Sequence, residues 1–107
     1  MASSLDFAIF ICEQLDGVGV IHFRKMFGEY MVYVNEKPVV LICDDTVYMK
    51  KLSCLEGFLE NHPTGNPYDR AKEHYILDPD DRETLCRAAA LAESVLPLPK
   101  KKTPKRR

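Results

Sequence analysis

The thiols and imidazoles of this sequence are the side chains best suited to nucleophilic or metal chemistry. There are four cysteines and three histidines, and no two cysteines form a C-x-x-C pair. Zinc sites usually draw on such closely spaced ligand pairs, so we expect neither a metal site nor a cofactor. Cys54 is the best nucleophile, since it falls in the first turn of an expected helix, where the dipole favours negative charge. An inert thiol is the competing interpretation.

His22 and the paired carboxylates add little to this chemistry. His22 alternates onto one face of an expected strand and has no evident partner, so an enzyme that uses Cys54 or His22 is kept as an alternative. The pairs Asp44-Asp45 and Asp80-Asp81 are explained by a turn and a helix start. The sequence contains no glycine-rich phosphate loop. It therefore predicts no catalytic residue and favours a protein that is not an enzyme.

Residues 24–30, Arg-Lys-Met-Phe-Gly-Glu-Tyr, combine charges, aromatic rings and a glycine between two expected strands. Such a mixture is typical of surfaces that bind a protein or a nucleic acid. The alternative is local packing, with Arg24 paired to Glu29 or lying over a ring. We expect a contact surface that this segment shares with the irregular loop near residue 68. Its expected residues are Arg24, Lys25, Phe27, Gly28, Glu29, Tyr30, Tyr68 and Lys72.

The last residues form a basic tail that contrasts with the rest of the chain. Its six basic side chains are Lys100, Lys101, Lys102, Lys105, Arg106 and Arg107, and no acid lies among them. The preceding residues hold nine basic and sixteen acidic side chains, so their net charge is −7. We expect residues 99–107 to be disordered and to contact polyanions such as nucleic acid without selectivity. A tail that only improves solubility is the alternative.

Length and composition indicate one globular domain over residues 1–98. The 107 residues are 46% hydrophobic and 29% charged, which is ordinary for such a domain. No apolar run approaches the roughly 20 residues of a membrane helix, and the N-terminus lacks a basic segment typical of a secretory signal. The isolated cysteines favour reduced thiols. We therefore expect a cytoplasmic protein with no membrane contact.

Periodicity predicts two helices at the ends of the chain and strands between them. Helical spacing covers residues 4–16, with Gly17 ending the helix, and a second helix starts at Asp78-Pro79 and ends at Pro97. A capping box at Ser53 predicts a short helix over 53–60, followed by a loop over 61–68. Expected strands cover 20–27, 30–34, 39–43, 47–50 and 75–77.

These elements predict an α+β fold. Short connections favour an antiparallel β-meander of about four to five strands, packed against the N- and C-terminal helices. The expected sheet carries more aromatic and apolar residues than two narrow helices can cover. One of its faces is therefore expected to pair with a second copy of the chain, and we predict a homodimer.

The sequence resembles the N-terminal domain of the TfoX/Sxy family, which includes bacterial regulators of natural competence. Arg24 to Gly28 is similar to the family's R-x-M-F-G signature, and the order of elements from Ser4 to Pro97 is similar too. The resemblance implies an α+β domain in the bacterial cytoplasm, near transcription, as the partner of a regulator. It supplies no catalytic residues. Competence regulators of the family carry a second, C-terminal helical domain, whereas this sequence ends in the basic tail.

Together, the residues and the resemblance predict a small, non-enzymatic protein-interaction domain that acts as a transcription-associated regulator. Two alternatives from other classes stay open. One is non-specific nucleic-acid binding through the basic tail, and the other is an enzyme that uses Cys54 or His22.

Overall fold

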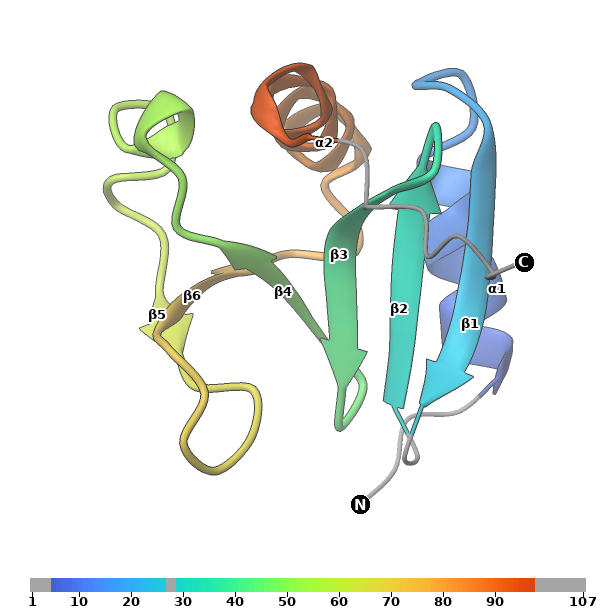
Figure 1. Ribbon diagram of the computed structural model, residues 1–107, viewed down its shortest axis with the longest axis horizontal. Coiled ribbons are helices and arrows are strands. Elements are labelled where there is room, and N and C mark those ends of the chain that lie inside the picture. The colour runs from blue at the N-terminus through green and yellow to red at the C-terminus, as the bar shows by residue number, and fades with distance from the viewer. Residues whose placement is uncertain (1–4, 27–28, 98–107) are drawn as a thin grey trace, which may run out of the picture.

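The computed structural model describes residues 5–26 and 29–97, and it confirms the expected α+β fold (Figure 1). Two helices and a short 3-10 helix accompany six strands. In chain order the elements are α1 (Leu5–Gln14), β1 (Ile21–Met26), β2 (Glu29–Val34), β3 (Lys37–Cys43), β4 (Thr46–Lys50), η1 (Ser53–Leu55), β5 (Thr64–Gly65), β6 (His74–Leu77) and α2 (Arg82–Val95).

The strands form one antiparallel sheet in the order β1-β2-β3-β4-β6-β5. The first four strands are the expected meander. Asn35-Glu36 joins β2 to β3 and Asp44-Asp45 joins β3 to β4, and all four of these residues have positive φ angles between 52° and 73°. Two-residue turns of this hand match the twist of the strands that they connect, and Asn and Asp tolerate the conformation.

Alternation along the strands separates an inner face from an outer face. In β2 the inner side chains of Tyr30, Val32 and Val34 are buried, whereas Met31 and Tyr33 between them are half-buried. The β2–β3 register shifts between Val32 and Tyr33, which places an extra residue in β3. This irregularity explains why β3 buries the consecutive residues Val39 and Val40, as a bulge re-aims one side chain.

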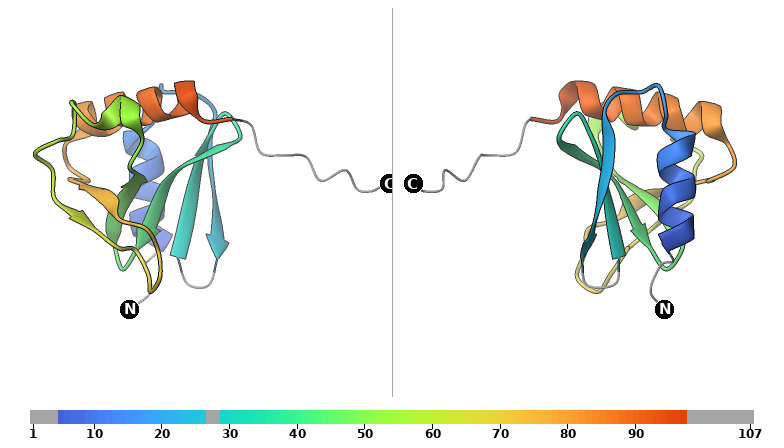
Figure 2. Two further views of the ribbon diagram at one scale, coloured as in Figure 1. Left: turned by 60° about the vertical axis from the view of Figure 1, so that its left-hand side comes forward. Right: turned by 90° about the vertical axis from the view of Figure 1, so that its right-hand side faces the viewer.

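Both helices cover the inner face. α1 lies behind β1 and β2, and α2 runs across one end of the sheet, as Figure 2 shows from two sides. α1 buries Ala8 and Ile11, and Leu15, directly after the helix, is buried with them. α2 buries the stripe that its spacing predicts, and its three alanines let the helix approach the sheet closely. That stripe is Leu85, Ala88, Ala89 and Ala92.

Hydrogen bonds join the end of α1 to the start of α2. The Cys86 thiol donates to the Gln14 carbonyl oxygen at 3.0 Å, and Arg82 Nη2 donates to the Asp16 carbonyl oxygen at 2.9 Å. Gln14 Nε2 in turn donates to the Pro79 carbonyl oxygen at 2.8 Å. Carbonyl groups at a helix end lack partners within the helix, and these contacts supply them.

Three expectations about local structure are wrong. The helix expected over 53–60 is the 3-10 helix Ser53–Leu55 followed by turns, because no side chain caps its start and Gly57 follows. β5 lies inside the loop expected over 61–68. α2 begins after Asp81 rather than at Asp78, since Asp78 Oδ1 accepts from the Asp80 N–H in a turn while Asp81 Oδ1 caps Thr84.

Leu5, at the start of the helix expected over residues 4–16, is exposed. Gly17 ends α1 with a φ of 101°, which suits a glycine after a helix. Phe27, Gly28 and the expected basic tail lie outside the described residues. Within residues 5–26 and 29–97, no helix is long and apolar enough to cross a membrane.

Candidate protein-interaction groove

The outer face of the sheet carries a row of half-buried apolar side chains. Register pairs Met31 with Leu41, Leu41 with Tyr48, and Tyr48 with Ile76, so these four side chains lie side by side across β2, β3, β4 and β6. In the part of the chain that the structure describes, no helix lies over this face, which is turned to the viewer in Figure 1. An apolar row without a helix over it is a surface that another molecule can cover.

Two hollows lie over this row. One of about 470 Å³ lies between the strands and the loop 66–73, and the other, of about 490 Å³, lies beside it toward Met26. Both are lined by Met31, Leu41 and Tyr68. Tyr68 is 56% exposed, although it is a large aromatic side chain. We call the two hollows together the outer groove, with Met26, Met31, Leu41, Tyr48 and Tyr68 as its apolar part.

The loop that carries Tyr68 is held in shape by its own hydrogen bonds. Asn66 Nδ2 donates to the Ala71 carbonyl oxygen at 2.7 Å, and the Ala71 N–H donates to the Tyr68 carbonyl oxygen at 3.0 Å. Arg70 takes a positive φ of 70° between these residues. The local bonds present Tyr68 and Arg70 to the groove without packing either side chain in the core.

Basic side chains border the outer groove. Lys50, Arg70 and Lys72 line the larger hollow and are exposed, and Arg24 lies next to Met31 across the β1–β2 pair. None of them forms an ion pair with a carboxylate among the residues that the structure describes. Glu29 is the acid that lines the smaller hollow. We call Lys50, Arg70 and Lys72 the basic rim.

Comparison with known proteins identifies the family of this chain. The model of the TfoX N-terminal domain matches residues 13–94, which is most of the chain. The chain belongs to the TfoX N-terminal domain family. It is also similar to an "uncharacterized 12.7 kDa protein in trpE 5′ region" of Spirochaeta aurantia, with 34% identity over 105 residues that cover 94% of this chain and 89% of the relative.

Only some residues of the contact surface that the sequence predicts for this TfoX N-terminal domain lie on the same face of the sheet. Arg24, Tyr68 and Lys72 come together on the outer face, and Glu29 lines the groove. Lys25 is exposed at the edge strand but pairs in register with Tyr30, so it points toward the helix side.

Tyr30 is a core residue, which corrects the expectation that it contacts a partner. It is 4% exposed, and its ring meets the ring of Phe23 edge-on at 5.6 Å. The alternation that buries Val32 also turns Tyr30 inward. Tyr30 therefore takes no part in the surface that we propose below.

Sequence reasoning missed the floor of the groove. Met31, Leu41 and Tyr48 belong to strands that were expected correctly, but each was counted only as a sheet residue. The signal that could have found them is the alternation itself, since residues opposite a buried face share the other face. Arg70 gave no signal, because loop geometry decides where its side chain points.

Cys54 and His22, the two residues considered for an enzymatic role in this TfoX N-terminal domain, both make local contacts. Cys54 is half-buried and its Sγ lies 3.7 Å from the Leu91 carbonyl oxygen, as a weak donor. His22 stacks on Tyr33, with ring centroids 4.8 Å apart. Burial, with Glu29 and Asp44 nearby, raises the pKa of the Cys43 thiol to about 11. Among the described residues, no group of three or more His, Cys, Asp or Glu side chains could hold a metal ion.

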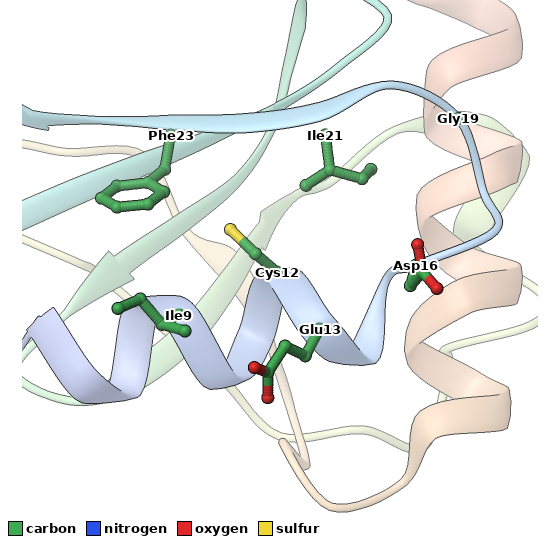
Figure 3. Close-up of a pocket in the computed structure, with 7 residues that line it drawn as sticks. All are labelled: Ile9, Cys12, Glu13, Asp16, Gly19, Ile21 and Phe23. Carbon is green, nitrogen blue, oxygen red and sulfur yellow. The ribbon is translucent and has the colours of Figure 1, made fainter.

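A further hollow lies between α1 and β1, where Figure 3 shows the Cys12 thiol directed toward β1 beside Ile21 and Phe23. Its volume is about 400 Å³, and Glu13 and Asp16 are among the residues that line it. Burial raises the pKa of Cys12, and the charge of Glu13 adds to the rise. A thiol kept protonated is a poor nucleophile, so this hollow offers packing rather than chemistry.

Proposed function

We propose that this TfoX N-terminal domain is a non-enzymatic protein-interaction domain, and that its partner lies in the outer groove. The observation that carries the proposal is the pair of apolar hollows around Tyr68, bordered by basic side chains that the fold does not use. Interfaces concentrate their binding energy in aromatic side chains that become buried, and an exposed tyrosine over an apolar floor is such a residue.

The family likeness extends the proposal to a role in transcription. The TfoX/Sxy family includes bacterial regulators of competence, so we propose that the partner is a component of transcription control. The four free thiols support a reducing, cytoplasmic setting for that role. The contacts of Cys54 and His22 support the non-enzymatic part of the proposal, since among the described residues Cys54 contacts a backbone carbonyl oxygen and His22 stacks on a tyrosine ring, and neither contact would activate a nucleophile.

Photo-crosslinking in the bacterial host tests the proposal. A crosslinking amino acid at position 68 is compared with one at position 20, since Val20 is also exposed, at 67%, but does not line the groove. We expect one protein to be captured from position 68 and not from position 20. Mass spectrometry then identifies the captured protein. A partner that has no role in transcription would contradict the proposed regulatory role.

Calorimetry with the captured partner, once purified, tests whether the groove holds it. Truncation of an interface aromatic typically costs about 2 kcal/mol or more, so Tyr68→Ala is expected to weaken binding by more than about tenfold. Val20→Ala is the matched control and should change binding less than about twofold. Equal effects of the two variants would show that the outer groove is not the contact surface.

A further inference from the structure

We infer that the outer groove selects an acidic protein segment, which places a large apolar side chain over Leu41 and carboxylates against the basic rim. This inference rests on the proposed function and names the chemistry of the partner. It is carried by two independent observations on the described residues, namely the apolar lining of the groove and the distribution of charge around it.

Four of the six basic side chains in residues 1–98 that lie outside the basic rim have partners among the described residues, and Arg24 and Lys25 are the other two. Lys37 pairs with Glu93 at 3.2 Å, and Lys51 pairs with Glu73 at 3.1 Å. Arg82 donates to a carbonyl oxygen of Asp16, and Arg87 lies over the ring of Phe58. The basic rim therefore differs from these four residues, because Lys50, Arg70 and Lys72 lie together at one hollow and none of them has an ion pair or a ring contact among the described residues, although residues 1–98 have a net charge of −7.

Clustered like charges repel one another, and a ligand with carboxylates relieves that repulsion. Lys50 ends β4, whereas Arg70 and Lys72 come from the loop beside it, so the rim faces the groove from two sides. In an extended or helical segment with acids on either side of one apolar residue, the carboxylates could pair with the basic rim while the apolar side chain packs on the floor of the groove. Charge complementarity of this kind mainly provides selectivity and fast association.

The apolar part of the groove explains why the ligand needs more than charge. The hollows of about 470 and 490 Å³ fall within the roughly 300–1,000 Å³ of protein ligand sites. Met31 and Leu41 form the floor that they share, and methionine adapts its shape to varied side chains. A leucine or phenylalanine of the partner would bury this floor together with one face of Tyr68.

Two other occupants fit the charges less well. The basic tail of this chain carries six positive charges and would be repelled by the rim. A second copy offers Phe58 between Glu56 and Glu60, but Arg87 already lies 5.5 Å from the centroid of that ring. A second copy is therefore an outcome of the test rather than the occupant that we propose.

Single-stranded nucleic acid also suits a basic sheet face, but the rings here are already engaged. His22 covers Tyr33 with nearly parallel planes, and Tyr48 meets His74 edge-on with centroids 6.4 Å apart. Tyr68 has no ring contact among the described residues. Nucleic-acid surfaces stack successive bases on several free aromatic faces, and one free ring does not provide such a series.

Fluorescence anisotropy with the full chain and defined probes tests the inference. The probes are labelled nonapeptide pools with a central Leu or Phe flanked by acidic, basic or neutral residues, and a labelled oligodeoxythymidine. We expect the acidic pool to bind at least about tenfold tighter than the neutral pool, and the advantage to shrink as salt rises. Tighter binding of the neutral pool, the basic pool or the oligonucleotide would overturn the inference.

A charge reversal with a matched control locates the effect. Lys72→Glu should weaken binding of the acidic pool by about fivefold or more, whereas Lys25→Glu should change it less than twofold, because Lys25 is also exposed but does not line the groove. Sedimentation of the same samples shows whether a second copy takes the site, and competition by a dimer would overturn the inference. A partner captured at position 68 together with a preference for neutral peptides would overturn the acidic selectivity and leave the proposed function standing.

Discussion

Replacing Tyr30 tests the assignment of inner and outer faces on which the groove depends. Tyr30 and Tyr68 are both tyrosines of the expected contact surface, but Tyr30 is 4% exposed and Tyr68 is 56% exposed. If the alternation of β2 is as the structure has it, Tyr30→Ala is a core mutation and Tyr68→Ala is a surface mutation. The two variants should therefore separate stability from binding.

The expected loss for Tyr30→Ala follows from the burial of its ring. A buried aromatic side chain hides roughly 150–250 Å², and at about 25 cal/mol per Å² most of that area is worth several kcal/mol. The edge-on contact with Phe23 adds about 0.5–1.5 kcal/mol. Large-to-small core changes of this type cost about 3–5 kcal/mol, which is a large part of the roughly 5–15 kcal/mol of a domain.

Urea unfolding followed by far-ultraviolet circular dichroism measures the difference. With a slope of roughly 1–3 kcal/mol per molar urea, the midpoint for Tyr30→Ala should fall by at least about 1 M. Tyr30→Phe keeps the ring and should stay within about 1 kcal/mol of the parent, and Tyr68→Ala within about 0.5 kcal/mol. A Tyr30→Ala variant as stable as the parent would refute the burial of Tyr30, and with it the outward placement of Met31, because one alternation fixes both.

Three further predictions concern charge, thiols and the tail. Hydrogen bonds from Asn35 and Lys37 lower the pKa of Glu93. The ionised carboxylate therefore stabilises the fold above the unfolded pKa of 4.5, and this stabilisation is lost as the pH falls through the lower folded pKa. The difference in urea midpoint between the parent and Glu93→Gln should shrink on acidification. With a pKa near 11, Cys43 should react with iodoacetamide at pH 8 far more slowly in the folded chain than in 8 M urea, and equal rates by mass spectrometry would contradict its burial. Duplex DNA affinity of the full chain should fall with salt with a logarithmic slope of about −5, from six tail charges, whereas residues 1–98 should bind weakly; equal slopes would exclude a role for the tail.

The sequence predicted the sheet well because its strands carry strong local signals. Residues 30–34 and 39–43 are rich in β-branched and aromatic residues, and the Asp44-Asp45 turn is short and polar. Helical spacing also predicted the second helix, and α2 buries Leu85, Ala88, Ala89 and Ala92 at that spacing. The start of α2 was not predicted, because Asp78 and Asp81 both suit a cap, and a turn that Asp78 forms with Asp80 decides between them.

The candidate site was predicted only in part because it depends on contacts between distant segments. Arg24 and Tyr68 have side chains that suit an interface, and this could be seen in the sequence. Their placement on one face depends on how β1 pairs with β2 and how the loop 66–73 folds over β3 and β4. Tyr30 was misassigned for the same reason, since a motif shows which residues are neighbours in sequence but not which face of a strand each one takes.

The hydrogen bonds between α1 and α2 have a consequence for how the chain folds during synthesis. Cys86 and Gln14 are 72 residues apart, and the buried stripe of α2 leaves the ribosome after the strands that it covers. At a synthesis rate of roughly 5–20 residues per second, several seconds pass between synthesis of the meander and synthesis of α2, and part of the inner face is uncovered during that time. We expect the nascent chain to depend on chaperones in that interval, because the apolar side of β2 and β3 gains its last cover only when α2 arrives.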